Sequence, residues 1–253
     1  HMPEPERCPY RAAVALAAGV VALLLLLAPR TTLWDRDESR FARSAVEMLA
    51  SGDFLVPTFA GELRPHKPPL LPWLMALSAS VLGPTEVAFR LWSALAHGAS
   101  VLLTFAAGRR LAGETAALLG AALLALSPLA LLEGAAATAD AVLLAGLTGV
   151  LAVFADAAVG GVRARHFVLG TIASAVAQLA KGPVALVLPL LGLGGALLLA
   201  PAAFRERRRL AGLLSASSLL GLLPVLGWGL LADAATNGRL LSAAIGTHVI
   251  GRP

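Results

Sequence analysis

The chain has 253 residues, of which 58% are hydrophobic and 14% are charged, and its formal net charge is +5. Its mean hydropathy of +0.80 is typical of a protein whose solvent is mostly lipid, and it excludes an ordinary water-soluble domain. The single cysteine, Cys8, leaves no disulfide within the chain. We expect membrane lipids among its partners and no nucleic acid.

Seven apolar runs are long enough, or nearly so, to cross a hydrocarbon core that needs ~20 residues. They lack the alternation of strands, and a helix satisfies its own backbone in lipid. We therefore expect an all-α membrane protein with about seven transmembrane helices. The runs cover residues 12–29, 87–108, 114–133, 139–158, 166–181, 183–201 and 210–231.

The chain divides into three parts. His1-Met2 is typical of the scar left by a removed tag, so we interpret residues 1–11 as a tag remnant and cytoplasmic lead. We expect residues 12–231 to form the transmembrane module, and residues 30–69, which the polar residues considered below single out, to be its catalytic loop. Residues 232–253 are expected to begin an extracytoplasmic loop that is truncated.

A further apolar stretch, residues 70–82, is too short to cross the bilayer comfortably. If it enters and returns while the N-terminus is cytoplasmic, four groups of arginines obey the positive-inside rule. A rival arrangement turns the N-terminus outward and lets 70–82 cross. Charge counting alone slightly favours this rival, because the loop 30–69 contains five arginines and Lys67. The four groups are Arg7 and Arg11, Arg109 and Arg110, Arg163 and Arg165, and the segment Arg205 to Arg209.

Within the catalytic loop, residues 37–50 are predicted to form an amphipathic helix that lies in the membrane interface and ends at Gly52. Asp37 and Glu38 begin this helix, where its dipole stabilises ionised carboxylates. Simple helix capping is the alternative to a catalytic role for both. The apolar face consists of Phe41, Ala45, Met48 and Leu49.

Lysine is scarce, since the chain has eighteen arginines and two lysines, Lys67 and Lys181. Each lysine precedes a proline-bearing turn, which suggests a special use. Snorkelling at the interface is the alternative, and it is favoured for Lys181.

Asp140 lies at the start of the fourth run, near the lipid boundary, where an ionisable residue usually faces a cavity. Helix capping is the alternative for Asp140. Glu133 and Arg90 have similar status and are candidates to pair with each other.

Five short motifs resemble, in order and spacing, those of the polytopic GT-C glycosyltransferases, specifically the aminoarabinose-transferase and protein O-mannosyltransferase relatives. The resemblance implies a sugar donor on a polyprenyl phosphate, and an active site on the periplasmic side of the bacterial inner membrane where Asp37, Lys67 and Asp140 converge. It also implies seven crossings, with 70–82 as a returning helix. The motifs are Asp37-Glu38-Ser39-Arg40-Phe41-Ala42, Glu47 to Asp53, His66-Lys67-Pro68-Pro69-Leu70, Thr138-Ala139-Asp140 and Leu179-Ala180-Lys181-Gly182-Pro183.

The chemistry suits these residue types. A departing phosphate needs a cation, which Lys67 supplies, with Arg40 and Lys181 as further candidates for phosphate binding. The acceptor hydroxyl, on a lipid, glycan or protein, must lose a proton, so Asp37 is the candidate base and burial is expected to raise its basicity. Glu38 completes the catalytic set with Asp140, which orients the sugar or acceptor, and in-line displacement inverts the anomeric carbon.

Two departures from the relatives leave alternatives open. His66 stands where the aminoarabinose transferases tend to have a glutamate associated with a metal, so we consider a divalent metal held by His66 and His248. The chain also stops at Gly251-Arg252-Pro253, before the further helices of the relatives. The alternatives to an enzyme are a non-catalytic, truncated scaffold that binds donor, and a transporter or lipid-binding membrane protein.

Overall fold

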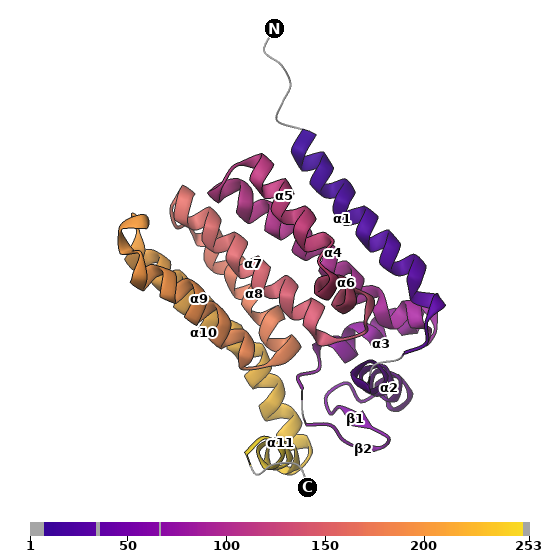
Figure 1. The fold of residues 1–253 in the computed structure, drawn as a ribbon. Helices are drawn as coiled ribbons and strands as arrows, with labels where there is room; N and C mark the ends of the chain where they lie inside the picture. The colour runs from indigo at the N-terminus through magenta and orange to yellow at the C-terminus, as the bar shows by residue number, and fades with distance from the viewer. Residues whose placement is uncertain (1–7, 34–35, 66, 250–253) are drawn as a thin grey trace.

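The structure, a computed structural model, describes residues 8–33, 36–65 and 67–249, and long helices running side by side dominate it (Figure 1). The helix α1 lies on one side of the row, and α9 and α10 lie on the other. The elements are α1 (Cys8–Leu27), η1 (Ala28–Arg30), α2 (Arg36–Ser51), β1 (Thr58–Phe59), β2 (Glu62–Leu63), α3 (Leu70–Leu82), α4 (Glu86–Leu111), α5 (Glu114–Ala125), α6 (Pro128–Ala135), α7 (Ala139–Gly160), α8 (Ala164–Lys181), α9 (Val184–Leu199), η2 (Pro201–Ala203), α10 (Arg207–Ala235) and α11 (Arg239–Val249).

The apolar runs predict the long helices well, with one exception. The run 114–133 is not one helix, because α5 and α6 meet at a bend of 58°. Pro128 is the first residue of α6; it has no N–H to donate, and it disfavours the helical conformation for Ser127, which is extended. A single straight helix here was therefore a wrong prediction.

Four described helices are long and apolar enough to cross a membrane, namely α1, α4, α7 and α10, and the bent pair α5–α6 makes a fifth. The 16-residue α9 is shorter than a typical span, and α8 is also outside this group. The described part of the chain is thus all-α apart from one small hairpin, in which β1 and β2 pair antiparallel.

The helices α7 and α8 approach each other very closely. A Cβ atom added to Gly146 would lie 2.7 Å from the Cβ of Ala177 and 2.7 Å from its backbone nitrogen. Small residues allow such close backbone packing between membrane helices. This contact brings the ends of the two helices together at both ends of the row.

The predicted helix in the catalytic loop exists as α2, and Gly52 ends it with a φ of +73°. What covers its apolar face was predicted wrongly. Phe41 and Ala45 are buried against Leu71 and Met75 of α3, so protein rather than lipid covers this face. Leu49 turns away from the core and is 37% exposed.

The described part of the loop 30–69 and the start of α7 lie at the same end of the row, which we call the site end. The Glu38 carboxylate accepts a hydrogen bond of 2.7 Å from the backbone N–H of Ala137, two residues before α7. Near the other end of α3, the Ser78 hydroxyl donates to the carbonyl of Ala88 in the first turn of α4. The rival arrangement, which puts the loop and the start of α7 on opposite sides of a bilayer, is therefore wrong.

Candidate functional site

The site end contains an ion pair between two of the predicted residues. The Lys67 Nζ atom lies 2.6 Å from Asp37 Oδ2, and the side chains are 24% and 38% exposed. The Nη1 atom of Arg40, one turn along α2, lies 3.9 Å from Asp37 Oδ1. The loop that follows α2 thus returns Lys67 to the first turn of that helix.

The Phe41 ring contacts two cations, Lys67 of this ion pair and Arg64. The Phe41 ring has the Arg64 guanidinium 4.2 Å from its centre and the Lys67 ammonium 5.0 Å from it, both within the range of cation–π attraction. Arg64 is only 7% exposed and donates to the carbonyl of Arg40. Arg64 was not predicted as a site residue, since nothing in the local sequence distinguishes it from the other arginines of the loop.

The charges around Asp37 decide its basicity. Burial opposes ionisation of Asp37, but the hydrogen bond from Lys67 and the charges of Lys67, Arg64 and Arg40 together outweigh it, and they hold the pKa of Asp37 below its ordinary value. Burial raises the pKa of Asp37, as expected, but the hydrogen bond from Lys67 and the three nearby cations, which were not anticipated to pair with it, reverse the net effect in this state. Burial also lowers the pKa of Arg64 to about 10, so this guanidinium stays charged at neutral pH.

A second ion pair joins the start of α7 to the end of α8, where Lys181 donates to Asp140. Lys181 is thus paired rather than simply extended toward an interface. The two pairs are neighbours, because the Pro68 ring lies 3.9 Å from where a side chain at Gly182 would begin. Both predicted lysines and both predicted aspartates therefore meet at the site end.

A cavity of about 380 Å³ opens beside Asp140. Glu133 also lines it, and the Thr138 hydroxyl donates to Glu133 at 2.6 Å. The remaining lining is mostly apolar and comes from α5, α6 and α7. Such a mixed lining suits a ligand with both a polar and an apolar part.

Glu38 has a different setting from Asp37. It is fully buried, and its two carboxylate oxygens accept from Arg90 at 3.0 and 3.3 Å. Arg90 also donates to the carbonyls of Ala28, Thr31 and Thr32. The sequence suggested Glu133 as the partner of Arg90, and that prediction was wrong.

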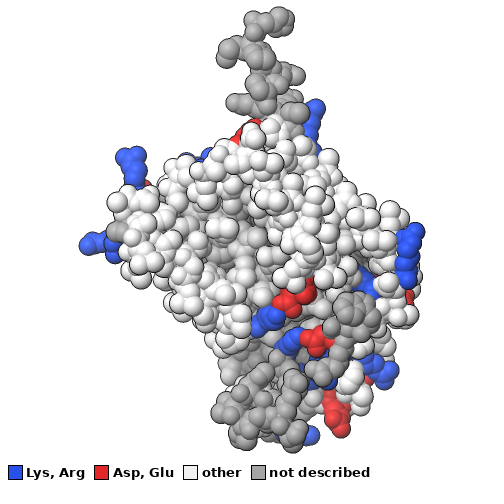
Figure 2. Space-filling view, viewed as in Figure 1, with Lys and Arg blue, Asp and Glu red and all other residues white. Residues whose placement is uncertain are grey.

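Charged side chains gather toward the site end on the face drawn in Figure 2, while the rest of that face is mostly white. His66 and the side chain of His248 lie outside the described residues, so the structure does not test the proposed metal site. Among the residues that are described, no three His, Cys, Asp or Glu side chains cluster as metal ligands. Asp37 already faces three cations, a setting that does not favour a divalent metal at this carboxylate.

Comparison with known proteins gives concordant results. The family described as dolichyl-phosphate-mannose-protein mannosyltransferase matches residues 66–228. An undecaprenyl phosphate-alpha-4-amino-4-deoxy-L-arabinose arabinosyl transferase of Pseudomonas savastanoi pv. phaseolicola is 42% identical over 37% of this chain and 17% of its own length. Another transferase of that name, from Edwardsiella ictaluri, is 31% identical over 70% of this chain and 33% of its own length. The chain thus spans a third or less of the length of these relatives.

Solved structures show the same fold. ArnT from Cupriavidus metallidurans bound to undecaprenyl phosphate has a TM-score of 0.77 and 28% identity, covering 88% of this chain and 42% of that chain. Its apo form has a TM-score of 0.80 at 24% identity, covering 95% of this chain and 44% of that chain, and shows the likeness of fold alone. With the family match extending over residues 66–228, these findings show that the chain belongs to the dolichyl-phosphate-mannose-protein mannosyltransferase family and is an ArnT-like member of the GT-C glycosyltransferase class.

Proposed function

We propose that this chain transfers a sugar from a polyprenyl phosphate to an acceptor hydroxyl, with inversion at the anomeric carbon. The observation that carries the proposal is the gathering of Lys67, Arg64 and Arg40 around the Asp37 carboxylate at one end of an apolar helical bundle. Three cations around one carboxylate leave an excess of positive charge for a phosphate. The related ArnT from Cupriavidus metallidurans has a solved structure with undecaprenyl phosphate bound, which supports this class of donor.

In the proposed mechanism, the donor phosphate takes the Lys67 ammonium away from Asp37. Charge-assisted hydrogen bonds then stabilise the phosphate as the bond between its oxygen and the anomeric carbon breaks. Asp37 loses the hydrogen bond that holds its pKa down, while burial and the nearby phosphate both raise it. Asp37 thereby becomes a better base when the donor is bound, and it accepts the proton of the hydroxyl that attacks the anomeric carbon.

The other residues of the site have supporting roles in this proposal. Asp140 and Lys181 line the side of the site next to the cavity of α5, α6 and α7, where they orient the sugar or acceptor. Glu38 acts as a positioning residue, because Arg90 occupies its carboxylate. It holds the first turn of α2, and with it Asp37, against the start of α7.

We infer seven crossings for the bundle, with α3 as a short helix that enters and returns on the periplasmic side. The arginines of the opposite end support this orientation, because basic residues concentrate on the cytoplasmic side of membrane proteins. Ion pairs at that end join Arg110 and Arg165 to Asp156 of α7. In this orientation the site end faces the periplasm of the bacterial inner membrane.

Calorimetry with undecaprenyl phosphate tests the donor site. Lys67→Ala should weaken binding by about 1.5–3 kcal/mol, or roughly 10- to 150-fold, because a charge-assisted hydrogen bond is lost. Arg43→Ala is the matched control, since Arg43 lies on α2 but is exposed and pairs with Glu47. Equal affinity of folded Lys67→Ala and the unmodified protein would refute the role of Lys67.

Transfer is tested separately from binding. The protein is given a donor labelled in the sugar and a bacterial membrane extract as the source of acceptor. Transfer by the unmodified protein and not by Asp37→Asn supports the enzyme. Donor binding without any transfer would identify this chain as a non-catalytic scaffold and would overturn the catalytic part of the proposal.

A further inference from the structure

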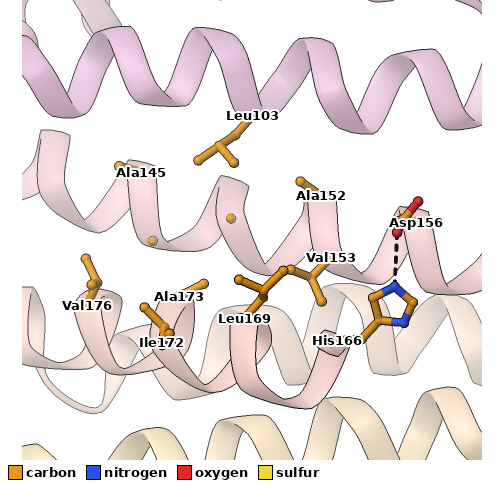
Figure 3. A pocket seen from close by; sticks show the side chains of 12 residues that line it. Leu103, Ala145, Ala152, Val153, Asp156, His166, Leu169, Ile172, Ala173 and Val176 are labelled. Carbon is orange, nitrogen blue, oxygen red and sulfur yellow. Dashed lines mark hydrogen bonds and ion pairs between the residues drawn. The ribbon is translucent and has the colours of Figure 1, made fainter. Parts of the chain in front are cut away.

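A second cavity lies away from the site end, in a groove between α7 and α8 (Figure 3). It has a volume of about 390 Å³. Leu103 of α4 overlooks it, and only Asp156 and His166, at one end, contribute ionisable side chains to its lining. The apolar lining includes Ala145, Ala152, Leu169, Ile172, Ala173 and Val176, and we call this feature the α7–α8 groove.

The polar end of the α7–α8 groove contains a cluster of cations around one carboxylate. Asp156 pairs with Arg110 at 2.5 Å, with Arg165 at 2.7 Å and with His166 at 3.0 Å. Arg110 and Arg165 are 45% and 53% exposed, so their remaining N–H groups are open to a ligand, whereas His166 is buried. Two arginines against one aspartate leave a net positive charge at this end of the groove.

We propose that the α7–α8 groove binds an anionic phospholipid, with one acyl chain in the groove and the headgroup phosphate on Arg110 and Arg165. Charge complementarity supports this occupant, since a site with net positive charge attracts an anionic headgroup more than a zwitterionic one, in which a cation offsets the phosphate. The further arginines of this end, Arg109 and Arg163, add to the attraction for anionic lipid. The proposal does not depend on sugar transfer.

The dimensions of the groove fit the same occupant. From Ala145 to Asp156 it follows α7 for about 16 Å at 1.5 Å per residue, close to half of a ~30 Å hydrocarbon core. A single acyl chain of one leaflet spans that half. A volume of about 390 Å³ over this length admits an alkyl chain. Another helix, with a diameter of about 10–12 Å including its side chains, is too wide for it.

The test measures lipid retention by native mass spectrometry of the detergent-purified protein. Phosphatidylglycerol and phosphatidylcholine with the same acyl chains are offered at equal concentration. The unmodified protein should retain phosphatidylglycerol about tenfold better. Arg110→Gln/Arg165→Gln should abolish this preference, and Arg209→Gln should keep it, because Arg209 is an exposed arginine of α10 that pairs with Glu206 outside the groove.

Filling the groove gives an independent result. Ala152→Phe places a ring where the acyl chain is proposed to lie, and it should reduce retention of both lipids at least fivefold while all charges remain. Ile172→Phe, at a more exposed position of the lining, serves the same purpose if Ala152→Phe does not fold. Equal retention of the two lipids by the unmodified protein, or normal retention in a folded groove-filling variant, would overturn the proposal. So would displacement of the lipid by millimolar inorganic phosphate, or a protein dimer in place of a lipid adduct.

Discussion

The pair formed by Glu38 and Arg90 offers the sharpest test of how the site is held. Both side chains are almost fully buried, at 0% and 3% exposure, and they connect α2 to α4. Arg90 also donates to carbonyls around η1, and Glu38 accepts from Ala137 before α7. We predict that Glu38→Gln lowers the free energy of unfolding. The substitution keeps the size of the side chain but removes the only charge that directly balances Arg90 in the described ion pairs.

The magnitude follows from the burial of the pair. Removing one partner of a buried ion pair typically costs about 3–5 kcal/mol, since the other charge stays buried without compensation. Arg90 keeps its carbonyl partners and Gln can still accept from Ala137, so we expect a loss near the lower figure. Glu38→Ala should lose about 1–3 kcal/mol more, because it also leaves the N–H of Ala137 without its acceptor.

Thermal unfolding in detergent, with denaturant titration for the free energy, measures this loss. Glu62→Gln is the matched control, since Glu62 is an exposed acid of the same loop and its substitution should leave stability unchanged. Undecaprenyl phosphate binding is measured on the same samples. If Glu38→Gln unfolds like the unmodified protein but loses sugar transfer, then Glu38 acts chemically, and our assignment of a positioning role is refuted.

Two further predictions concern acid stability and helix packing. Because the pKa of Asp37 is lowered on folding, its ion pair stabilises the protein at pH values above the ordinary pKa of 3.8, and this stabilisation is lost as the pH falls through the lower folded-state value. Between about pH 5 and 3, Asp37→Asn should therefore lose less thermal stability than the unmodified protein does. An identical pH dependence of the two proteins would contradict this prediction. Gly146→Ala should destabilise the protein by about 1–3 kcal/mol, since the added Cβ meets the backbone of Ala177 at 2.7 Å. Gly160→Ala, at the open end of α7, should cause no such loss in denaturant titration, and an equal loss in both variants would refute the role of close packing at Gly146.

The sequence predicts the helices of this chain because apolar length is a local property. The ends of α4, α7 and α8 fall close to the predicted runs for that reason. The bend before Pro128 was missed, although the proline was visible, because hydropathy remains high through it. The covering of α2 was also missed, since a face that contacts protein and a face that contacts lipid have the same apolar residues.

The sequence also identifies most of the charged residues of the site but not how they pair. Lys67 and Asp37 lie thirty residues apart, and only the return of the intervening loop brings them together. Arg90 has Glu38 as its partner rather than Glu133, because α2 and the segment around η1 converge on its guanidinium, and the Ala137 N–H before α7 holds the Glu38 carboxylate there. Arg64 gains its importance from its contacts with the Phe41 ring and its charge near Asp37, which depend on how the hairpin of β1 and β2 returns the chain to α2.

The pairing of Asp37 with Lys67 links the two halves of the proposed reaction. An anionic donor that takes Lys67 raises the pKa of Asp37, so donor binding and the activation of the base are a single event. Coupling between two equilibria is reciprocal, and protonation of Asp37 must therefore strengthen donor binding by the same factor. In the absence of donor the low pKa keeps Asp37 a weak base, and its ion pair holds Lys67 in place. In the proposed mechanism, Asp37 therefore becomes an effective base only when the sugar phosphate donor is bound.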